Sequence, residues 1–346
     1  MLNFLLKILI IVLLPLLIVV GLNYFLDPAK LFAKSYEKEI VDILINGNNA
    51  TNIVNYDERR FQEDFIHNKE KQDIIILGSS RTLLIRDEFY INKTLLNNSV
   101  SGASIEDIIA IYQIHKLNKS LPDKIYIGID PWLFNDMNNQ NRWHSISKYY
   151  HLFTGNYLRN SESNSKKFFE LFSLSYFQES IKSIPQVLIN GFHPLKTDSR
   201  SNKNNTKLID GSLVYGETYR NATNKEIDDK AKIYIEDQIY SIESFQNLSE
   251  KIMNEFELLI EDMRKSDVKI VFVLVPYHPM VFDKIKSEEK YINVLLSENY
   301  IMQFSREHNI NVLGTFNPYA INFYEFDFYD GMHCTEKGIN KILSFE

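Results

Sequence analysis

The clearest indication of the fold in this chain is the sequence DIIILGSSR at Asp73–Arg81. Residues 73–77 form a short apolar run without alternation, which is typical of a strand buried on both faces of a parallel sheet. Gly78 permits a tight turn directly after that strand. The serines that follow would then stand at the carboxyl edge of the sheet, where open α/β folds bind ligands. The stretch predicts Ser80 as a reactive hydroxyl or, alternatively, Ser79 or Ser80 as the N-cap of a following helix.

Further apolar runs continue the same pattern along the chain. Strands are predicted at 124–129 (KIYIGI), 268–275 (VKIVFVLV) and 310–313 (INVL). Between them, Ser104–Leu117 and Leu248–Arg264 place apolar residues at helical spacing. Alternating strand and helix signals favour an α/β class with a doubly wound parallel sheet.

The N-terminus is strongly apolar. Residues 8–20 read ILIIVLLPLLIVV without a charge, and the apolar character extends from about Phe4 to Leu26, interrupted only by Lys7. About 20 such residues are needed to cross a bilayer as a helix, so this segment is long enough. No Ala-x-Ala-like cleavage site follows, so residues 1–26 are predicted to be an uncleaved transmembrane signal anchor. Lysines occur on both sides of this segment, so the charge bias does not decide its orientation.

The rest of the chain divides into two parts. Residues 27–72 are expected to form a polar and amphipathic stem, with a loop in the Asn-rich stretch Asn46–Asn55. Residues 73–346 are expected to form the α/β domain. A long segment at about 133–225 lacks clear strands of the central sheet, and we expect an insertion there that covers the sheet's carboxyl edge.

The composition of the chain argues against one class of binding partner. The chain has 346 residues, a formal net charge of −7 and no concentrated basic stripe, which argues against nucleic acid as the main partner. Cys334 is the only cysteine, so no intramolecular disulfide can form. Its neighbour His333 suggests a Cys-His nucleophile, but adjacent side chains rarely point at each other productively.

A second motif, Asp330-Gly331-Met332-His333, lies close to the C-terminus. An Asp three residues before a His can hold the imidazole and stabilise its charged form while the His acts as a base. Thr335 is predicted to cap a helix that begins at Glu336, which leaves His333 just outside that helix. The alternatives are a surface turn, or a metal site that uses Asp327 together with Asp330 and His333.

Together, GSSR after the first sheet strand and DGMH near the C-terminus resemble the SGNH (GDSL-type) hydrolase superfamily. The resemblance covers residues 73–346 without the insertion and implies a three-layer α/β/α flavodoxin-like fold. It implies that Ser80 is the nucleophile, with Asp330 and His333 completing the catalytic set. Gly102, within residues 99–104 (SVSGAS), matches the glycine whose N–H joins that of Ser80 in an oxyanion hole. No metal and no organic cofactor is implied.

One motif departs from this family. Its third block reads Gly-x-Asn-Asp, whereas residues 128–131 here read Gly-Ile-Asp-Pro, with Asp130 in the place of the Asn. A carboxylate repels an oxyanion, so Asp130 is not assigned that role. Arg81 is a candidate for the missing donor or for a structural salt bridge. Arg81, Asp130 and His278, which follows the strand at 268–275, are candidate substrate contacts, with a proline-rigidified strand exit as the alternative for His278.

The apolar N-terminus and the divergent third block are similar to the membrane-anchored branch of bacterial envelope pathways. That branch includes the D-alanine-transfer protein of teichoic acid systems and relatives of the alginate O-acetyltransferases. The resemblance implies an esterase or O-acyltransferase outside the membrane, acting on a surface or secreted polysaccharide. It also implies a multispanning membrane acyltransferase as a partner. The alternative is a non-catalytic glycan-binding or scaffold protein that retains the fold.

Overall fold

A five-stranded parallel sheet forms the centre of the computed structural model, which describes residues 2–27, 36–54, 56–155, 168–169, 171–191, 193–236 and 238–345. The strands lie in the order β3-β2-β4-β8-β9, and each neighbouring pair is parallel. Their bounds are β2 (Ile74–Leu77), β3 (Leu95–Asn97), β4 (Lys124–Gly128), β8 (Lys269–Leu274) and β9 (Asn311–Gly314). The predicted mixed α/β class is therefore confirmed.

Four of these strands coincide with the predicted apolar runs to within one or two residues. Strand β3 was not predicted, because only two apolar residues precede Asn97 in it. The predicted helices are also present as α4 (Ile105–Leu117) and α10 (Glu250–Lys265). Ser104 caps α4 in a capping box with Asp107, which explains why the helix begins where it does.

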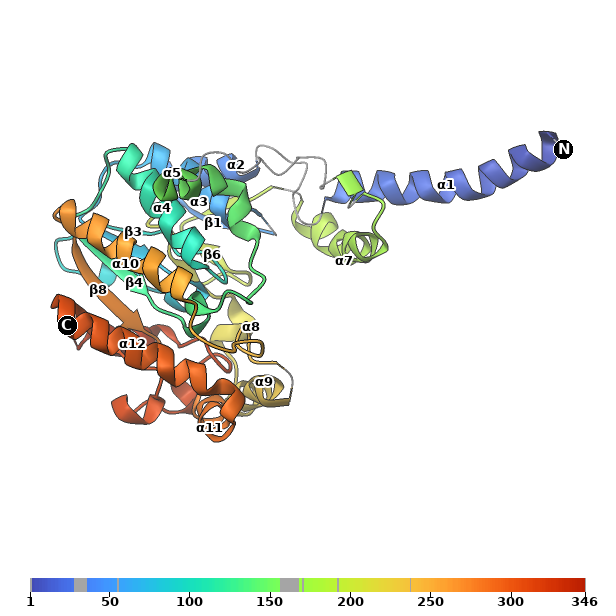
Figure 1. Cartoon of the computed structure of the whole chain (residues 1–346). Helices are drawn as coiled ribbons and strands as arrows, with labels where there is room; N and C mark the ends of the chain where they lie inside the picture. Colours follow the sequence, from blue (N-terminus) through green and yellow to red (C-terminus); the bar gives the residue numbers. More distant parts are fainter. Residues whose placement is uncertain are drawn as a thin grey trace.

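Each face of the sheet has its own hydrophobic cluster, because successive side chains of a strand point to opposite faces. Ile75 and Leu77 face the cluster that includes α4, α10 and α12 (Ile292–His308), which lie along one side of the sheet in Figure 1. Ile74 and Ile76 face a second cluster, which includes apolar residues of α13 (Glu336–Leu343). As predicted, α13 begins at Glu336 with Thr335 as its N-cap.

A second, antiparallel sheet joins distant parts of the chain. Its order is β5-β1-β6-β7. Strand β1 (Asn49–Thr51) lies in the Asn-rich stretch predicted as a loop, so that prediction is wrong at these three residues. The other strands lie within the predicted insertion and are β5 (Leu195–Thr197), β6 (Thr206–Lys207) and β7 (Leu213–Val214).

The remaining helices surround these two sheets or follow the N-terminus. They are α2 (Tyr36–Ile45), α3 (Glu58–Asn68), α5 (Ser147–Thr154), α7 (Leu174–Asn190), α8 (Glu217–Arg220), α9 (Asn224–Glu236) and α11 (Pro279–Ser287). Helices α2 and α3 contribute to the main hydrophobic core, with Phe61 and Phe65 of α3 fully buried. The stretch expected to be a stem therefore adds to the core of the sheet-containing body.

The N-terminal segment forms α1 (Leu2–Leu26), which packs against α7 beside the sheet-containing body (Figure 1). The buried Asn23 amide joins the two helices, because its oxygen accepts from the hydroxyl of Ser180 in α7 at 2.9 Å. Its nitrogen donates to the carbonyl of Leu171, just before α7, at 2.9 Å. In the part of the chain that the structure describes, no helix combines the length and hydropathy required to cross a membrane. The side chains of residues 2–12, which belong to the expected anchor, lie outside that part.

Two glycines allow β2 and β4 to approach each other at their carboxyl ends. A Cβ atom on Gly128 would lie 2.6 Å from Cγ2 of Thr82. A Cβ atom on Gly78 would lie 2.5 Å from Oγ1 of Thr82 and 3.1 Å from Cα of Gly128. Thr82 Oγ1 in turn donates to the carbonyl of Ser79 at 3.0 Å. The close packing of these residues thus fixes the turn that carries Ser80.

Replacement of Gly128 by alanine should destabilise the protein by about 1–3 kcal/mol, as overpacking of a tight core position typically does. Thr82→Ser removes Cγ2 but keeps the hydroxyl. The Gly128→Ala substitution should therefore cost less free energy of unfolding in a Thr82→Ser background than in the native chain. Urea denaturation of the four proteins measures this, and an equal cost in both backgrounds would contradict the packing described here.

Candidate active site

Ser80 begins a 3₁₀ turn, η1 (Ser80–Thr82), directly after β2. The capping role falls to Ser79, whose buried hydroxyl accepts from the Arg81 N–H at 3.1 Å. The Ser80 hydroxyl is thereby left for another partner. Its Oγ lies 2.9 Å from Nε2 of His333, a residue 253 positions further along the chain.

His333 is held on its other side by Asp330. Its Nδ1 lies 2.9 Å from Oδ2 and 3.0 Å from Oδ1 of that carboxylate. Because a carboxylate accepts hydrogen bonds, this contact places the imidazole proton on Nδ1 and leaves Nε2 able to accept the Ser80 proton. The structure thus brings together the three residues that the sequence predicts as a catalytic set.

The loop around Asp330 is short and closed on itself. Oδ1 of Asp330 accepts from the backbone N–H groups of Met332 and His333, both at 2.9 Å. Burial by itself raises the pKa of Asp330, but His333 and these hydrogen bonds outweigh it and hold that pKa below its ordinary value. Asp330 is therefore ionised at neutral pH, as its role beside an imidazole requires.

Two backbone N–H groups are available for an oxyanion. Within the described residues, neither the N–H of Ser80 nor that of Gly102 has a hydrogen-bond acceptor. Gly102 has φ +55°, and a Cβ atom there would lie 2.1 Å from the Tyr240 hydroxyl, so a larger residue would be strained and crowded. These observations agree with the donor role that the family resemblance implies for both residues.

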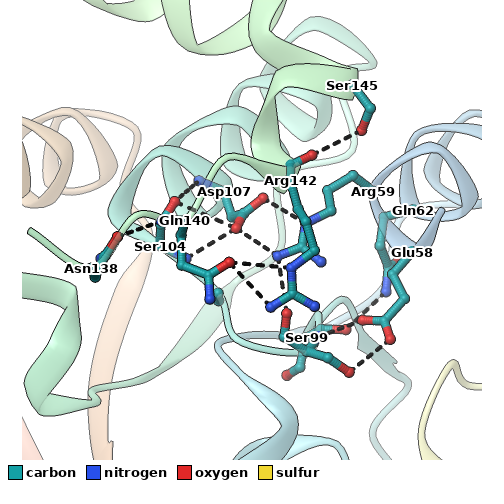
Figure 2. Close-up of polar contacts among 12 residues, drawn as sticks. Glu58, Arg59, Gln62, Ser99, Ser104, Asp107, Asn138, Gln140, Arg142 and Ser145 are labelled. Carbon is teal, nitrogen blue, oxygen red and sulfur yellow. Dashed lines mark hydrogen bonds and ion pairs between the residues drawn. The ribbon is translucent and has the colours of Figure 1, made fainter. Parts of the chain in front are cut away.

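A polar network fixes the loop that carries Gly102 (Figure 2). The buried Arg59 guanidinium donates to both carboxylate oxygens of Asp107, at 2.8 and 2.9 Å, and to the carbonyl of Ser101 at 3.1 Å. Glu58 accepts from the backbone N–H and from the hydroxyl of Ser101. Residues of α3 and α4 thus hold the chain on either side of Gly102.

Arg81 and Asp130 form a buried ion pair behind Ser80. Nη1 of Arg81 lies 3.0 Å from Oδ1 of Asp130, and the two side chains are 0% and 4% exposed. Burial raises the pKa of Asp130, although Arg81 and the Ser79 hydroxyl act in the opposite direction. The remaining guanidinium N–H groups donate to the carbonyls of Met332, Val275 and Pro276. This arrangement corresponds to the structural salt bridge considered as one alternative for Arg81.

His278 is also buried and lies behind the site. Its backbone N–H donates to the carbonyl of Gly331 at 3.1 Å, while its side-chain Nδ1 accepts from Met280 at the start of α11. Nε2 lies 3.7 Å from Oδ1 of Asp228. The proposed substrate contacts at Arg81, Asp130 and His278 are therefore corrected, because all three side chains are shielded from solvent and support the strand ends instead.

The geometry supports neither the Cys-His nucleophile nor the metal site that the C-terminal sequence suggests. Cys334 is buried, and burial raises the pKa of its thiol, which makes it a poor nucleophile. Among the residues that the structure describes, no group of three His, Cys, Asp or Glu side chains is arranged to hold a metal ion. Asp327 instead accepts from the backbone of Tyr324.

A cavity of about 180 Å³ opens at Ser80. The sequence analysis predicted that the insertion reaches this edge of the sheet, and the insertion does supply part of the wall. The residues of the insertion that line the cavity were not predicted individually. A two-residue strand such as β6 does not show from its own sequence which side chain will lie near Ser80. The cavity is lined by Ile53, Tyr56, Glu58, Ser80, Leu83, Ser101, Asn205, Lys207, Leu213 and Tyr215.

Comparison with known proteins leaves the family open. No protein-family model matches the chain, and no curated protein matches it.

Loss of Arg81 should be strongly destabilising. Arg81→Met leaves Asp130 as an uncompensated buried charge, and breaking a buried pair in this way typically costs about 3–5 kcal/mol. The Arg81→Met/Asp130→Leu double variant should recover part of that loss because no unpaired charge is left. Chemical denaturation of the three proteins provides the test. A double variant less stable than Arg81→Met would contradict the assignment.

Proposed function

We propose that the protein is a serine-dependent O-acyltransferase or esterase that forms an acyl-Ser80 intermediate. The observation that carries the proposal is the continuous chain of contacts from Ser80 Oγ to His333 Nε2 and from His333 Nδ1 to Asp330. Within the described residues the N–H groups of Ser80 and Gly102 have no acceptor, and Ser101, next to Gly102, lines the cavity that opens at Ser80. These are the parts that acyl transfer through a serine requires.

In the proposed mechanism, His333 Nε2 takes the Ser80 proton as Oγ attacks the acyl carbonyl. The N–H groups of Ser80 and Gly102 stabilise the tetrahedral oxyanion. His333 then returns the proton to the leaving oxygen, which departs as an alcohol and leaves acyl-Ser80. An acceptor hydroxyl or water gives its proton to His333, attacks the acyl group and releases Ser80.

The fold is consistent with this proposal. Counted along the chain, the strands of the central sheet have the spatial order 2-1-3-4-5, which is the order of flavodoxin-like doubly wound folds. We infer a three-layer α/β/α arrangement of the SGNH type from this order, from the apolar clusters on both sheet faces and from the two motifs. Asp130, which stands where the family has Asn, forms a buried ion pair with Arg81 and so has a structural role. Its presence is therefore compatible with an active site.

We further propose that the substrate is a cell-envelope or secreted polysaccharide and that a multispanning membrane acyltransferase supplies the acyl group. In this proposal residues 1–26 anchor the protein in the cell membrane, with the site on the extracytoplasmic side. The apolar run of residues 8–20 supports the anchor, as do the exposed side chains of Leu13, Leu14, Leu17 and Ile18 in α1.

The test of the chemistry is covalent labelling by an uncharged fluorophosphonate, read by intact mass and peptide mapping of the detergent-solubilised full chain. A single adduct on Ser80 is expected. Ser80→Ala should abolish it, and His333→Ala should slow labelling by roughly 10²–10⁴-fold, the usual contribution of a general base. Ser101→Ala is the matched control, since Ser101 lines the same cavity but its hydroxyl binds Glu58. Absence of an adduct on the folded protein would favour the non-catalytic glycan-binding role.

The anchor has its own test. The full chain should stay with membranes through an alkaline carbonate wash, because an apolar helix of about 20 residues is held in the hydrocarbon core. A chain carrying Leu14→Lys and Ile18→Lys should be released by the same wash. Retention of both proteins, or release of both, would oppose residues 1–26 as the anchor.

A further inference from the structure

Lys207 is a buried cation in the wall of the Ser80 cavity. It lies at the end of β6, is 3% exposed and lines the cavity together with Ser80. Its ammonium stands 5.2 Å from the centre of the Phe61 ring. Within the described part of the chain, no hydrogen-bond or ion-pair partner contacts Nζ. An ammonium has three N–H donors, and an anion inside the cavity would accept hydrogen bonds from them.

The two carboxylates near Lys207 accept hydrogen bonds from other groups. Glu58 lines the same cavity but accepts from the N–H and the hydroxyl of Ser101. Asp210 accepts from the N–H and the hydroxyl of Ser212 and from the N–H of Asp87. Neither carboxylate comes within ion-pair distance of Lys207. Their negative charges favour the ammonium form of Lys207, but they accept no hydrogen bond from it.

Two phenol groups share the cavity with Lys207. Tyr56 and Tyr215 line it, and within the described residues their hydroxyl groups have no hydrogen-bond partner. Burial raises the pKa of both phenols well above the ordinary value, so both hydroxyls keep their protons and can donate. Three donor groups without partners, one ammonium and two phenols, therefore belong to residues that line the cavity at Ser80, and such a set is complementary to an anion.

We propose that the molecule that reacts at Ser80 carries a carboxylate or a phosphate group, and that Lys207 binds this group inside the cavity. The proposal rests on the proposed function and specifies its substrate class. It makes Lys207 a specificity-determining residue of that site. A neutral ester of the same shape would leave the ammonium unpaired and would bind less tightly for that reason.

The ionisation of Lys207 is compatible with this role. Burial lowers its pKa to about 8, and the fields of Glu58 and Asp210 partly oppose that shift. The ammonium form therefore predominates at neutral pH, and anion binding should weaken as the pH rises through about 8. The titratable groups that face Lys207 are Glu58 and Tyr56 near α3, with Asp210 and Tyr215 next to β7.

The experiment compares three sugars that share the glucose ring and differ in the group at C6: glucose, glucuronate and glucose 6-phosphate. Binding to the detergent-solubilised full chain is measured by calorimetry at constant ionic strength, and protection of Ser80 from the uncharged fluorophosphonate is measured in parallel. Glucuronate, glucose 6-phosphate or both should bind and protect, whereas glucose at the same concentration should not. The two charged sugars distinguish a carboxylate-bearing substrate from a phosphate-bearing one.

Lys207→Met should weaken binding of the charged sugar by roughly 10- to 100-fold, the range expected for a hydrogen bond to a charged group. Lys196→Met is the matched control, because Lys196 is an exposed lysine on β5 of the same small sheet. Lys207→Gln serves as a second variant that keeps a donor without charge, and circular dichroism verifies that each variant is folded.

Three outcomes would overturn the proposal. They are equal binding of glucose and the charged sugars, unchanged affinity in both Lys207 variants, or no binding of any sugar to the folded protein. A Lys207→Met variant that labels slowly without any sugar would assign Lys207 to the oxyanion instead, and this too overturns the proposal. Failure of Ser80 to react at all would count against the proposed function alone, because calorimetry reads anion binding without any reaction at Ser80.

Discussion

The Arg81 guanidinium, fully shielded from solvent, occupies the point at which the strand ends and the C-terminal loop meet. It pairs with Asp130 after β4, donates to the carbonyls of Val275 and Pro276 after β8, and donates to Met332 inside the Asp330–His333 loop. Removing an arginine from water is costly, and the cost is offset only when nearly every donor finds an acceptor. These contacts tie the loop that carries His333 to the strand ends next to the Ser80 turn.

Much of the central fold was readable from the sequence, because buried parallel strands leave an unbroken apolar run and a helix start leaves a cap. The four longer strands, α4, α10 and the start of α13 were all found in this way. Strand β3 was missed because its neighbours in space, rather than its own composition, make it a strand. Strand β1 was missed for the same reason: Asn49–Thr51 has little strand preference, and its partners lie about 145 or more residues away.

Some residues of the candidate site could likewise be predicted from short motifs, and others could not. Ser80, Gly102, Asp330 and His333 sit in short motifs, so their meeting at one sheet edge followed from topology. The roles of Arg81 and Asp130 depend on both side chains facing the interior, and no local sequence pattern predicts that orientation. Lys207 is harder still, because its position depends on the pairing of Ala50 with Lys207 across two short strands. Short motifs therefore predict the residues that we propose to react, while long-range pairing of short strands places the other residues that line the cavity.

The small sheet also sets an order of assembly. Its central strand β1 leaves the ribosome before any strand of the main sheet, but its partners β5 and β6 follow only after β4. Loops of that length close slowly, because the entropy of closure is lost before the contacts form. The nascent chain must therefore carry Asn49–Thr51 unpaired while β2, β3 and β4 are synthesised. The part of the cavity wall that contains Lys207 is therefore completed late. A chain stalled before β6 would contain the Ser80 turn but would lack Lys207, Leu213 and Tyr215, which line the cavity in the complete chain.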